Sequence, residues 1–157
     1  MKTYEITQVD LVETPVAVVR ATLSVAQMGP WLSQAFGAVD AYVAGRGVGP
    51  VGMPFGRYHP VGGDRFAVEA GFPVAHEVAG AGQVVGSRLP GGPAVQTWHV
   101  GPYEALAAAY EALEGWLREH GGTAVGDAWE VYHSDPAAEP DPAGWRTEVI
   151  QPFRFAG

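Results

Sequence analysis

The chain of 157 residues contains no cysteine, which excludes disulfides, thiol nucleophiles and cysteine-ligated zinc together. It is also poor in positive charge. Lysine and arginine number nine against 17 acidic residues, which leaves a formal net charge of −8. Because neutralising the phosphates of nucleic acids requires clustered basic side chains, we expect no direct nucleic-acid binding.

Several other signals are missing. No apolar run approaches the roughly 20 residues of a membrane-spanning helix, and the N-terminus lacks the basic and apolar regions of a secretory signal. The five histidines, at 59, 76, 99, 120 and 133, show no His-x-x-x-His spacing, so we expect no metal and no cofactor. Nucleophile-elbow and phosphate-loop motifs are absent. We expect a soluble cytoplasmic protein without a membrane partner.

A set of landmarks occurs twice along the chain, in the same order. Each copy has a Gly-Pro-aromatic segment, then an aromatic-x-x-Tyr-His segment, then a Glu-x-x-x-Pro segment; these are 29–31, 55–59 and 69–73 in the first copy and 101–103, 129–133 and 148–152 in the second. The repeat predicts one domain over residues 1–157 with two βαββ halves, about 1–75 and 76–157, related by a pseudo-twofold axis. The fold class is therefore α+β.

Local patterns predict the elements of each half. Apolar stripes at helical spacing predict helices near 28–43 and 103–117, each opened by its Gly-Pro pair. Alternating and β-branched runs predict strands near 3–9, 15–23, 51–58, 65–72, 83–89, 94–99, 127–133 and 145–151. The Pro90–Pro93 turn between two apolar runs predicts a hairpin. We expect an antiparallel sheet with both helices on one face.

Strand alternation places the polar groups of the two copies. Glu130 and Tyr132 share one face of their strand, and Gly56 and Tyr58 occupy the corresponding positions in the first copy. We therefore expect two tyrosines and one carboxylate to converge in a ligand cleft between the two predicted halves. A single glutamate on a strand is more commonly exposed to solvent than functional. Glu130 has aromatic neighbours, and the first copy has no carboxylate at the corresponding position, so we weigh the two interpretations of Glu130 about equally.

Other residues have structural interpretations. Glu69 and Glu148 recur in both copies, which favours a structural role such as a bond to arginine. We expect the stripe residues to pack on the sheet face opposite the cleft, namely Trp31, Phe36, Leu106, Tyr110 and Leu113.

Five segments together resemble the GyrI-like small-molecule-binding domain, the effector-binding module of multidrug-sensing transcription regulators, which also occurs as a stand-alone protein. They are 69–74, 89–92, 99–103, 129–132 and 147–152, and the resemblance covers nearly the whole chain. In multidrug-sensing members, aromatic side chains stack on flat cationic ligands and a buried glutamate pairs with their charge. The resemblance assigns the glutamate to Glu130. We expect the ligand contacts to be Glu130, Tyr132, Tyr58, Gly56, Trp98, Trp145 and Phe72.

The resemblance leaves three functions open. The first is a stand-alone binder of hydrophobic, aromatic and often cationic small molecules. The second is a hydrolase of cyclopropane-bearing, DNA-alkylating natural products, with Glu130 activating water and Tyr58 or Tyr132 donating to the substrate carbonyl. The third is a gyrase-inhibitor-like module that binds a protein partner. Because the resemblance takes up nearly all of these residues, we expect no helix-turn-helix domain among them.

Overall fold

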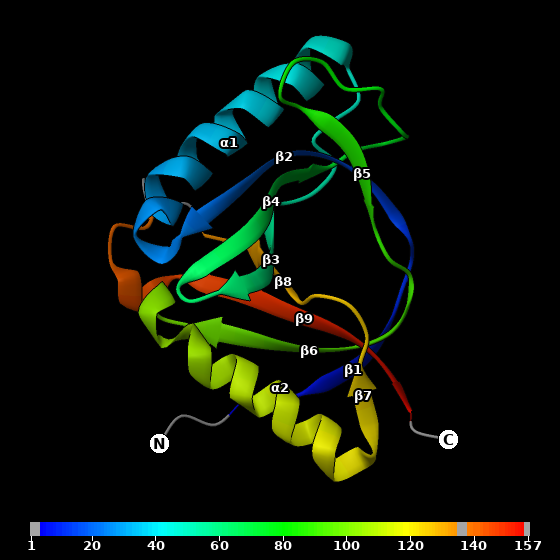
Figure 1. Cartoon of the computed structure of the whole chain (residues 1–157), viewed down its shortest axis with the longest axis vertical. Helices are drawn as coiled ribbons and strands as arrows, with labels where there is room; N and C mark the ends of the chain where they lie inside the picture. Colours follow the sequence, from blue (N-terminus) through cyan, green and yellow to red (C-terminus); the bar gives the residue numbers. More distant parts are fainter. Residues whose placement is uncertain (1–3, 135–137, 156–157) are drawn as a thin grey trace. The chain divides into compact units, whose positions relative to one another are not determined.

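The computed structural model describes residues 4–134 and 138–155. The chain divides into two compact units: residues 13–90 form the α1 unit, and residues 1–12 with 91–157 form the α2 unit. Each unit contains an antiparallel sheet and one long helix (Figure 1). The predicted α+β class, with antiparallel strands and two main helices, is confirmed. Neither helix is long and apolar enough to cross a membrane, nor is any other in the described part of the chain.

The α1 unit has four strands in the order β3-β4-β2-β5, and all neighbours are antiparallel. Along the chain its elements are β2 (Thr14–Ser24), α1 (Val25–Arg46), β3 (Phe55–Gly62), β4 (Arg65–Pro73) and β5 (Val85–Leu89).

Helix α1 begins earlier than the sequence predicts. The expected start at Gly29-Pro30 is wrong, because the helix starts at Val25 and Pro30 lies inside it. The Gln27 side chain accepts a hydrogen bond from the Ser24 backbone N–H at 2.9 Å, which satisfies a donor at the N-terminus. Pro30 is the sixth residue of α1, beyond the first turn, and because proline has no N–H it cannot donate to the carbonyl of Ala26. The helix ends as predicted at Gly47, whose φ of 67° is left-handed.

The α2 unit has strands in the order β1-β6-β9-β8, with β7 pairing the end of β9. Its elements are β1 (Thr7–Leu11), β6 (Gly92–Val100), the 3₁₀ turn η1 (Tyr103–Ala105), α2 (Leu106–His120), β7 (Gly122–Ala124), β8 (Trp129–Tyr132), the 3₁₀ turn η2 (Pro142–Gly144) and β9 (Arg146–Phe155). Here the Gly-Pro prediction is right, because Pro102 caps η1 and α2 follows directly.

The Pro90–Pro93 turn does not form the predicted hairpin. Strand β5, before it, pairs with β2, whereas β6, after it, pairs with β1 and β9. The first strand of the chain therefore belongs to the α2 unit. For this reason the unit boundaries differ from the repeat boundaries near residue 75 that the sequence predicts. The turn connects β5 and β6, but these strands do not pair with each other because each pairs with strands that are distant in the sequence.

The strand registers of the two units are equivalent. Glu69 on β4 lies opposite Arg20 on β2 and Arg57 on β3. In the same way, Glu148 on β9 lies opposite Trp98 on β6 and Val131 on β8. The landmarks matched by the repeat thus hold matching ladder positions, although duplication of the halves stays a prediction.

Each helix packs on its own sheet around an apolar core. In the α1 unit the core includes Ala35, Val39 and Val43 of the helix, with Trp31 and Phe36 packed against it. In the α2 unit the helix contributes four buried residues, Leu106, Ala109, Leu113 and Leu117, and Tyr110 packs beside them. The predicted helical stripes are therefore confirmed as core-facing.

Leu113 gives a test of this packing. Its side chain is 2 % exposed, and truncating a buried leucine leaves a cavity, so Leu113→Ala should lower the free energy of unfolding by about 2 to 5 kcal/mol. Chemical denaturation monitored by circular dichroism measures this. Glu114→Ala, at the adjacent exposed position of α2, is the matched control and should change stability little. Equal stabilities for the two variants would contradict the packing of α2.

Candidate functional site

Glu130 is a buried carboxylate held by two tyrosines. Glu130 is 9 % exposed to solvent. The Tyr110 hydroxyl, from α2, donates to Glu130 Oε2 at 2.5 Å, and the Tyr132 hydroxyl, two residues along β8, donates to Glu130 Oε1 at 2.9 Å. Each carboxylate oxygen therefore accepts one bond from an uncharged phenol.

Glu130 lies on the sheet face that α2 covers. Its ladder partner is Val149, which belongs to the core beneath α2, and Tyr110 reaches it from the helix itself. The prediction that Leu106, Tyr110 and Leu113 pack on the sheet face opposite the Glu130 cleft is therefore wrong, because Leu106 and Leu113 share the core of Val149. A tyrosine on a core-facing stripe buries its ring and still needs a partner for its hydroxyl, and here Glu130 is that partner.

Burial raises the pKa of the Glu130 carboxyl above its ordinary value, because removal from water penalises the charged form. The hydrogen bonds from Tyr110 and Tyr132 favour the carboxylate and oppose this rise without cancelling it. No described arginine, lysine or histidine forms an ion pair with Glu130. The site thus has a carboxyl group whose charge none of the side chains in residues 4–134 and 138–155 balances.

Aromatic rings extend from this carboxylate to the surface. The Tyr103 ring meets the Tyr132 ring edge-on, with centroids 5.8 Å apart, and the Trp145 ring at 4.8 Å. The Trp145 indole N–H donates to the Glu139 carbonyl at 2.7 Å, which fixes the indole. Tyr103 is 37 % exposed. A line of three rings therefore runs from solvent to the tyrosine that bonds Glu130.

Trp98 lies on the other face of the α2-unit sheet. It alternates with Thr97 and His99 along β6 and lies opposite Glu148, whereas Val95 on the same strand faces α2. The Trp98 ring contacts His133 at 4.7 Å between centroids and carries the Arg146 guanidinium at 5.0 Å. The structure therefore does not bring Trp98 together with Glu130 as the ligand set predicts.

Three predicted ligand contacts lie in the α1 unit. Gly56 and Tyr58 pair with Ala70 and Val68 on β4, and Ala70 faces α1, so both occupy the helix-covered face as Glu130 and Tyr132 do in their own unit. Phe72 packs against the core beneath α1, edge-on to Phe36 at 6.0 Å. The ligand role of these three residues stays a prediction.

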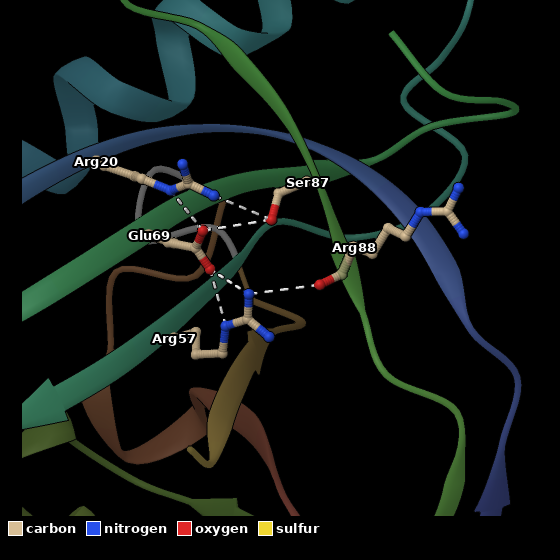
Figure 2. A network of polar contacts seen from close by, with 5 residues as sticks. All are labelled: Arg20, Arg57, Glu69, Ser87 and Arg88. Carbon is tan, nitrogen blue, oxygen red and sulfur yellow. Dashed lines mark hydrogen bonds and ion pairs between the residues drawn. The ribbon is translucent and has the colours of Figure 1, made fainter. Parts of the chain in front are cut away.

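Glu69, unlike Glu130, is a carboxylate whose negative charge is compensated by arginine side chains (Figure 2). Its oxygens accept from Arg20 Nε at 2.7 Å, from Arg57 Nε at 2.8 Å and from Ser87 Oγ at 3.3 Å. Arg88 contributes its main-chain carbonyl to Arg57 while its side chain points away. Burial alone would raise the pKa of Glu69, but the bonds and charges of Arg57 and Arg20 outweigh it and lower that pKa. The structural role predicted for Glu69 agrees with these bonds.

Glu148, the counterpart of Glu69, is bonded differently. Gln96 Nε2 donates to its Oε2 at 3.1 Å, and His133 Nε2 lies 3.2 Å from its Oε1. Within residues 4–134 and 138–155, no three histidine, aspartate or glutamate side chains are arranged to hold a metal ion. Among the carboxylates described above, Glu130 is the one that combines deep burial with bonds from uncharged donors only.

The family model of the GyrI-like small-molecule-binding domain matches residues 4–154 of the chain. The chain belongs to the GyrI-like family. No curated protein matches it.

Solved structures show the same fold as this GyrI-like domain. The EcmrR–DNA complex has a TM-score of 0.80 and 21 % identity; the match covers 98 % of this chain and 58 % of that one. The separate EcmrR C-terminal domain has a TM-score of 0.77 and 19 % identity, with coverage of 99 % and 100 %. The GyrI-like chain thus spans a little more than half of the EcmrR chain in the DNA complex.

Two more distant structures are informative. A hydrolase from Listeria innocua has a TM-score of 0.67 and 13 % identity, with coverage of 96 % and 92 %. SAV2435 bound to tetraphenylphosphonium has a TM-score of 0.60 and 12 % identity, with coverage of 96 % and 94 %. At these identities the likeness establishes the fold of the GyrI-like domain and no more.

Sequence reasoning missed Tyr110 and Tyr103 as members of the site. Helical spacing locates both residues, but it cannot distinguish a tyrosine whose hydroxyl bonds a carboxylate from one that only packs. The available signal was chemical: Tyr110 is a polar-tipped residue among Leu and Ala positions that face the sheet.

The raised pKa of Glu130 predicts how its stability contribution depends on pH. The folded state favours the protonated carboxyl, so this contribution is complete below the unfolded value near 4.5 and is lost as the pH rises through the folded pKa. Glu130→Gln should therefore be more stable than the unmodified chain near neutral pH, with a difference that shrinks toward pH 4.5. Denaturant unfolding at a series of pH values measures the difference in the free energy of unfolding between the two proteins. The other carboxyl groups are the same in both proteins, so their contributions to this difference cancel. A pH-independent difference would contradict the burial of an unbalanced carboxyl.

Proposed function

We propose that this GyrI-like domain binds hydrophobic aromatic small molecules, cationic ones in particular, with Glu130 as the partner of the ligand's positive charge. The observation that carries the proposal is the pairing of Glu130 with phenols and with no cation among the described residues. A buried carboxylate without a counter-ion gains most from a cation that arrives with little water of its own.

The rings beside Glu130 suit the same ligands. A flat cation held against Tyr132, Tyr103 or Trp145 gains a cation-π attraction of about 0.5 to 2 kcal/mol per favourable contact. Apolar ring faces also reward burial without demanding a particular hydrogen-bond pattern. The negative charge of Glu130 and the apolar surface of the rings therefore favour aromatic cations as a class and do not select one molecule.

The solved structures support this proposal. SAV2435 binds tetraphenylphosphonium, a bulky organic cation surrounded by aromatic rings, and shares this fold. The family itself is defined by small-molecule binding. We assign the domain no contact with nucleic acid, because its net charge of −8 opposes approach to phosphates.

Removing the charge of Glu130 tests the proposal directly. Glu130→Gln keeps the shape of the side chain, and its affinity for a cationic aromatic dye should fall by about tenfold or more, which corresponds to about 1.4 kcal/mol. Affinity for a neutral aromatic analogue should change little. Fluorescence titration measures both. Glu114→Gln removes one exposed charge from α2 and should leave both affinities unchanged. Equal dye binding by all three proteins would show that Glu130 is not the charge partner.

The raised pKa of Glu130 favours a second candidate, hydrolysis of a strained ring. An ionised Glu130 would accept a proton from water as the water oxygen attacks a ring carbon, while the breaking carbon–carbon bond sends its electrons toward a carbonyl of the substrate. The enolate formed in this way would then take one proton, from Glu130 or from solvent, which completes the addition of one water and returns Glu130 to its ionised form. The Tyr132 hydroxyl donates to Glu130 in the structure. It would have to turn away from Glu130 to serve the carbonyl, and Tyr58 remains the alternative donor that the sequence predicts.

Turnover separates this candidate from simple binding. With a cyclopropane-bearing alkylating compound as probe, the hydrolase predicts a product heavier by one water, detected by mass spectrometry. Glu130→Gln should abolish that product and leave binding of the neutral substrate nearly intact, because the lost interaction acts on the transition state. Binding without any product in the unmodified chain would refute the hydrolase and leave the binding proposal standing.

A further inference from the structure

We infer that this domain exchanges a proton for its ligand: when an organic cation binds beside Glu130, the carboxyl group releases its proton to solvent. The inference rests on the proposed function and concerns how the same site is regulated. Glu69 and Glu130 each lie on a strand of an antiparallel sheet, but their side chains have different bonding partners.

The contrast between the two glutamates is one of bonding partners. Glu69 accepts from two guanidinium groups, those of Arg20 and Arg57, so its negative charge is compensated in every state of the protein. In the described part of the chain, the hydroxyls of Tyr110 and Tyr132 are the groups that bond Glu130, and these hydroxyls are dipoles that carry no positive charge. A carboxylate in such a site, 9 % exposed, is stable as an ion only when a positive charge is supplied from outside.

The elements packed around Glu130 supply no such charge among the described residues. Helix α2 presents Tyr110, β8 presents Tyr132, and η1 presents Tyr103 against Tyr132. Strand β9 places apolar Val149 opposite Glu130. Strand alternation turns the adjacent Glu148 to the other face of the sheet, where Gln96 and His133 bond it.

One histidine does share the α2-covered face with the tyrosines. His99 on β6 is fully buried, and its ring nitrogens are bonded to the Tyr4 hydroxyl at 2.9 Å and to the Pro102 carbonyl at 3.0 Å. It forms no ion pair with Glu130. The charge of the ligand is therefore the one that completes the site.

Below the folded pKa of Glu130, the exchange keeps the site neutral throughout. Before binding, the carboxyl is protonated and uncharged; afterwards, a carboxylate and an organic cation sum to zero, and one proton has moved to the buffer. An isolated buried charge, which is costly, is thus avoided in both states. The raised pKa of Glu130 supports this sequence of states. A neutral ligand in the same site releases no proton.

A pH-dependent affinity follows. Below the folded pKa of Glu130, the dissociation constant of a permanent cation should rise about tenfold for each unit by which the pH falls, since one proton must be displaced. Above that pKa the carboxylate is already formed, and the affinity should be independent of pH.

Isothermal titration calorimetry tests the exchange with tetraphenylphosphonium, which has no proton of its own to lose. Titrations of the unmodified chain between about pH 5 and pH 8, in buffers of different ionisation enthalpy, give the number of protons released from the dependence of the heat on the buffer. We expect close to one proton per cation at pH values below the folded pKa of Glu130, declining as the pH rises through it. Triphenylphosphine oxide, a neutral probe, should release none.

Three variants locate the proton. Glu130→Gln should bind the cation weakly and with no proton release, and Glu114→Gln should behave as the unmodified chain. Tyr132→Phe removes a bond that favours the carboxylate, so its proton release should persist to higher pH. Near-ultraviolet circular dichroism verifies that each variant is folded.

The outcomes are distinct. Cation binding without proton release at every pH would overturn the exchange and leave the proposed function standing. Equal proton release by Glu130→Gln would assign the proton to another group and would also overturn it. If tetraphenylphosphonium does not bind the unmodified chain at all, the proposed function fails, and the exchange fails with it.

Discussion

The hydrogen bonds that Tyr110 and Tyr132 donate to Glu130 connect the fold of the α2 unit with its chemistry. They join helix α2 to strand β8, and they satisfy a carboxyl group that the core would otherwise not tolerate. Because the donors are phenols, the bonds orient the carboxyl without balancing its charge. The helix must therefore lie on the same face as Glu130, and the rings of Tyr103 and Trp145 continue from there to the surface.

The chain uses its glutamates for two purposes with the same physical rules. Arg20 and Arg57 compensate Glu69, which consequently has a lowered pKa and acts within the sheet of the α1 unit. Burial without a counter-ion gives the pKa of Glu130 the opposite shift. A stabilising ion pair consumes the charge of a carboxylate, whereas an unbalanced carboxyl retains the capacity to receive a ligand's charge.

Much of this organisation could be predicted from the sequence. Strand alternation correctly places Glu130 beside Tyr132, the recurrent position of Glu69 indicates a bond to arginine, and apolar spacing locates both helices. The failures have physical causes. The N-terminus of α1 depends on Ser24 and Gln27 and not on Pro30. The partner of each strand beside the Pro90–Pro93 turn is set by long-range pairing. The sheet face that Trp98 occupies depends on the strand register, which a sequence motif does not specify. Tyr110 was missed because helical periodicity describes where a ring points and says nothing of its hydroxyl.

Membership of the GyrI-like family accounts for the fold and for small-molecule binding, and the proposed role of Glu130 would account for a preference for cations. This account depends above all on the charge state of one carboxyl in the absence of ligand. Carbon-13 NMR of the glutamate side-chain carboxyls, titrated with pH and assigned by Glu130→Gln and Glu69→Gln, measures that state directly. The account predicts that Glu130 titrates above the ordinary value of 4.5 and Glu69 below it. Titration of Glu130 at or below the value for Glu69 would contradict it.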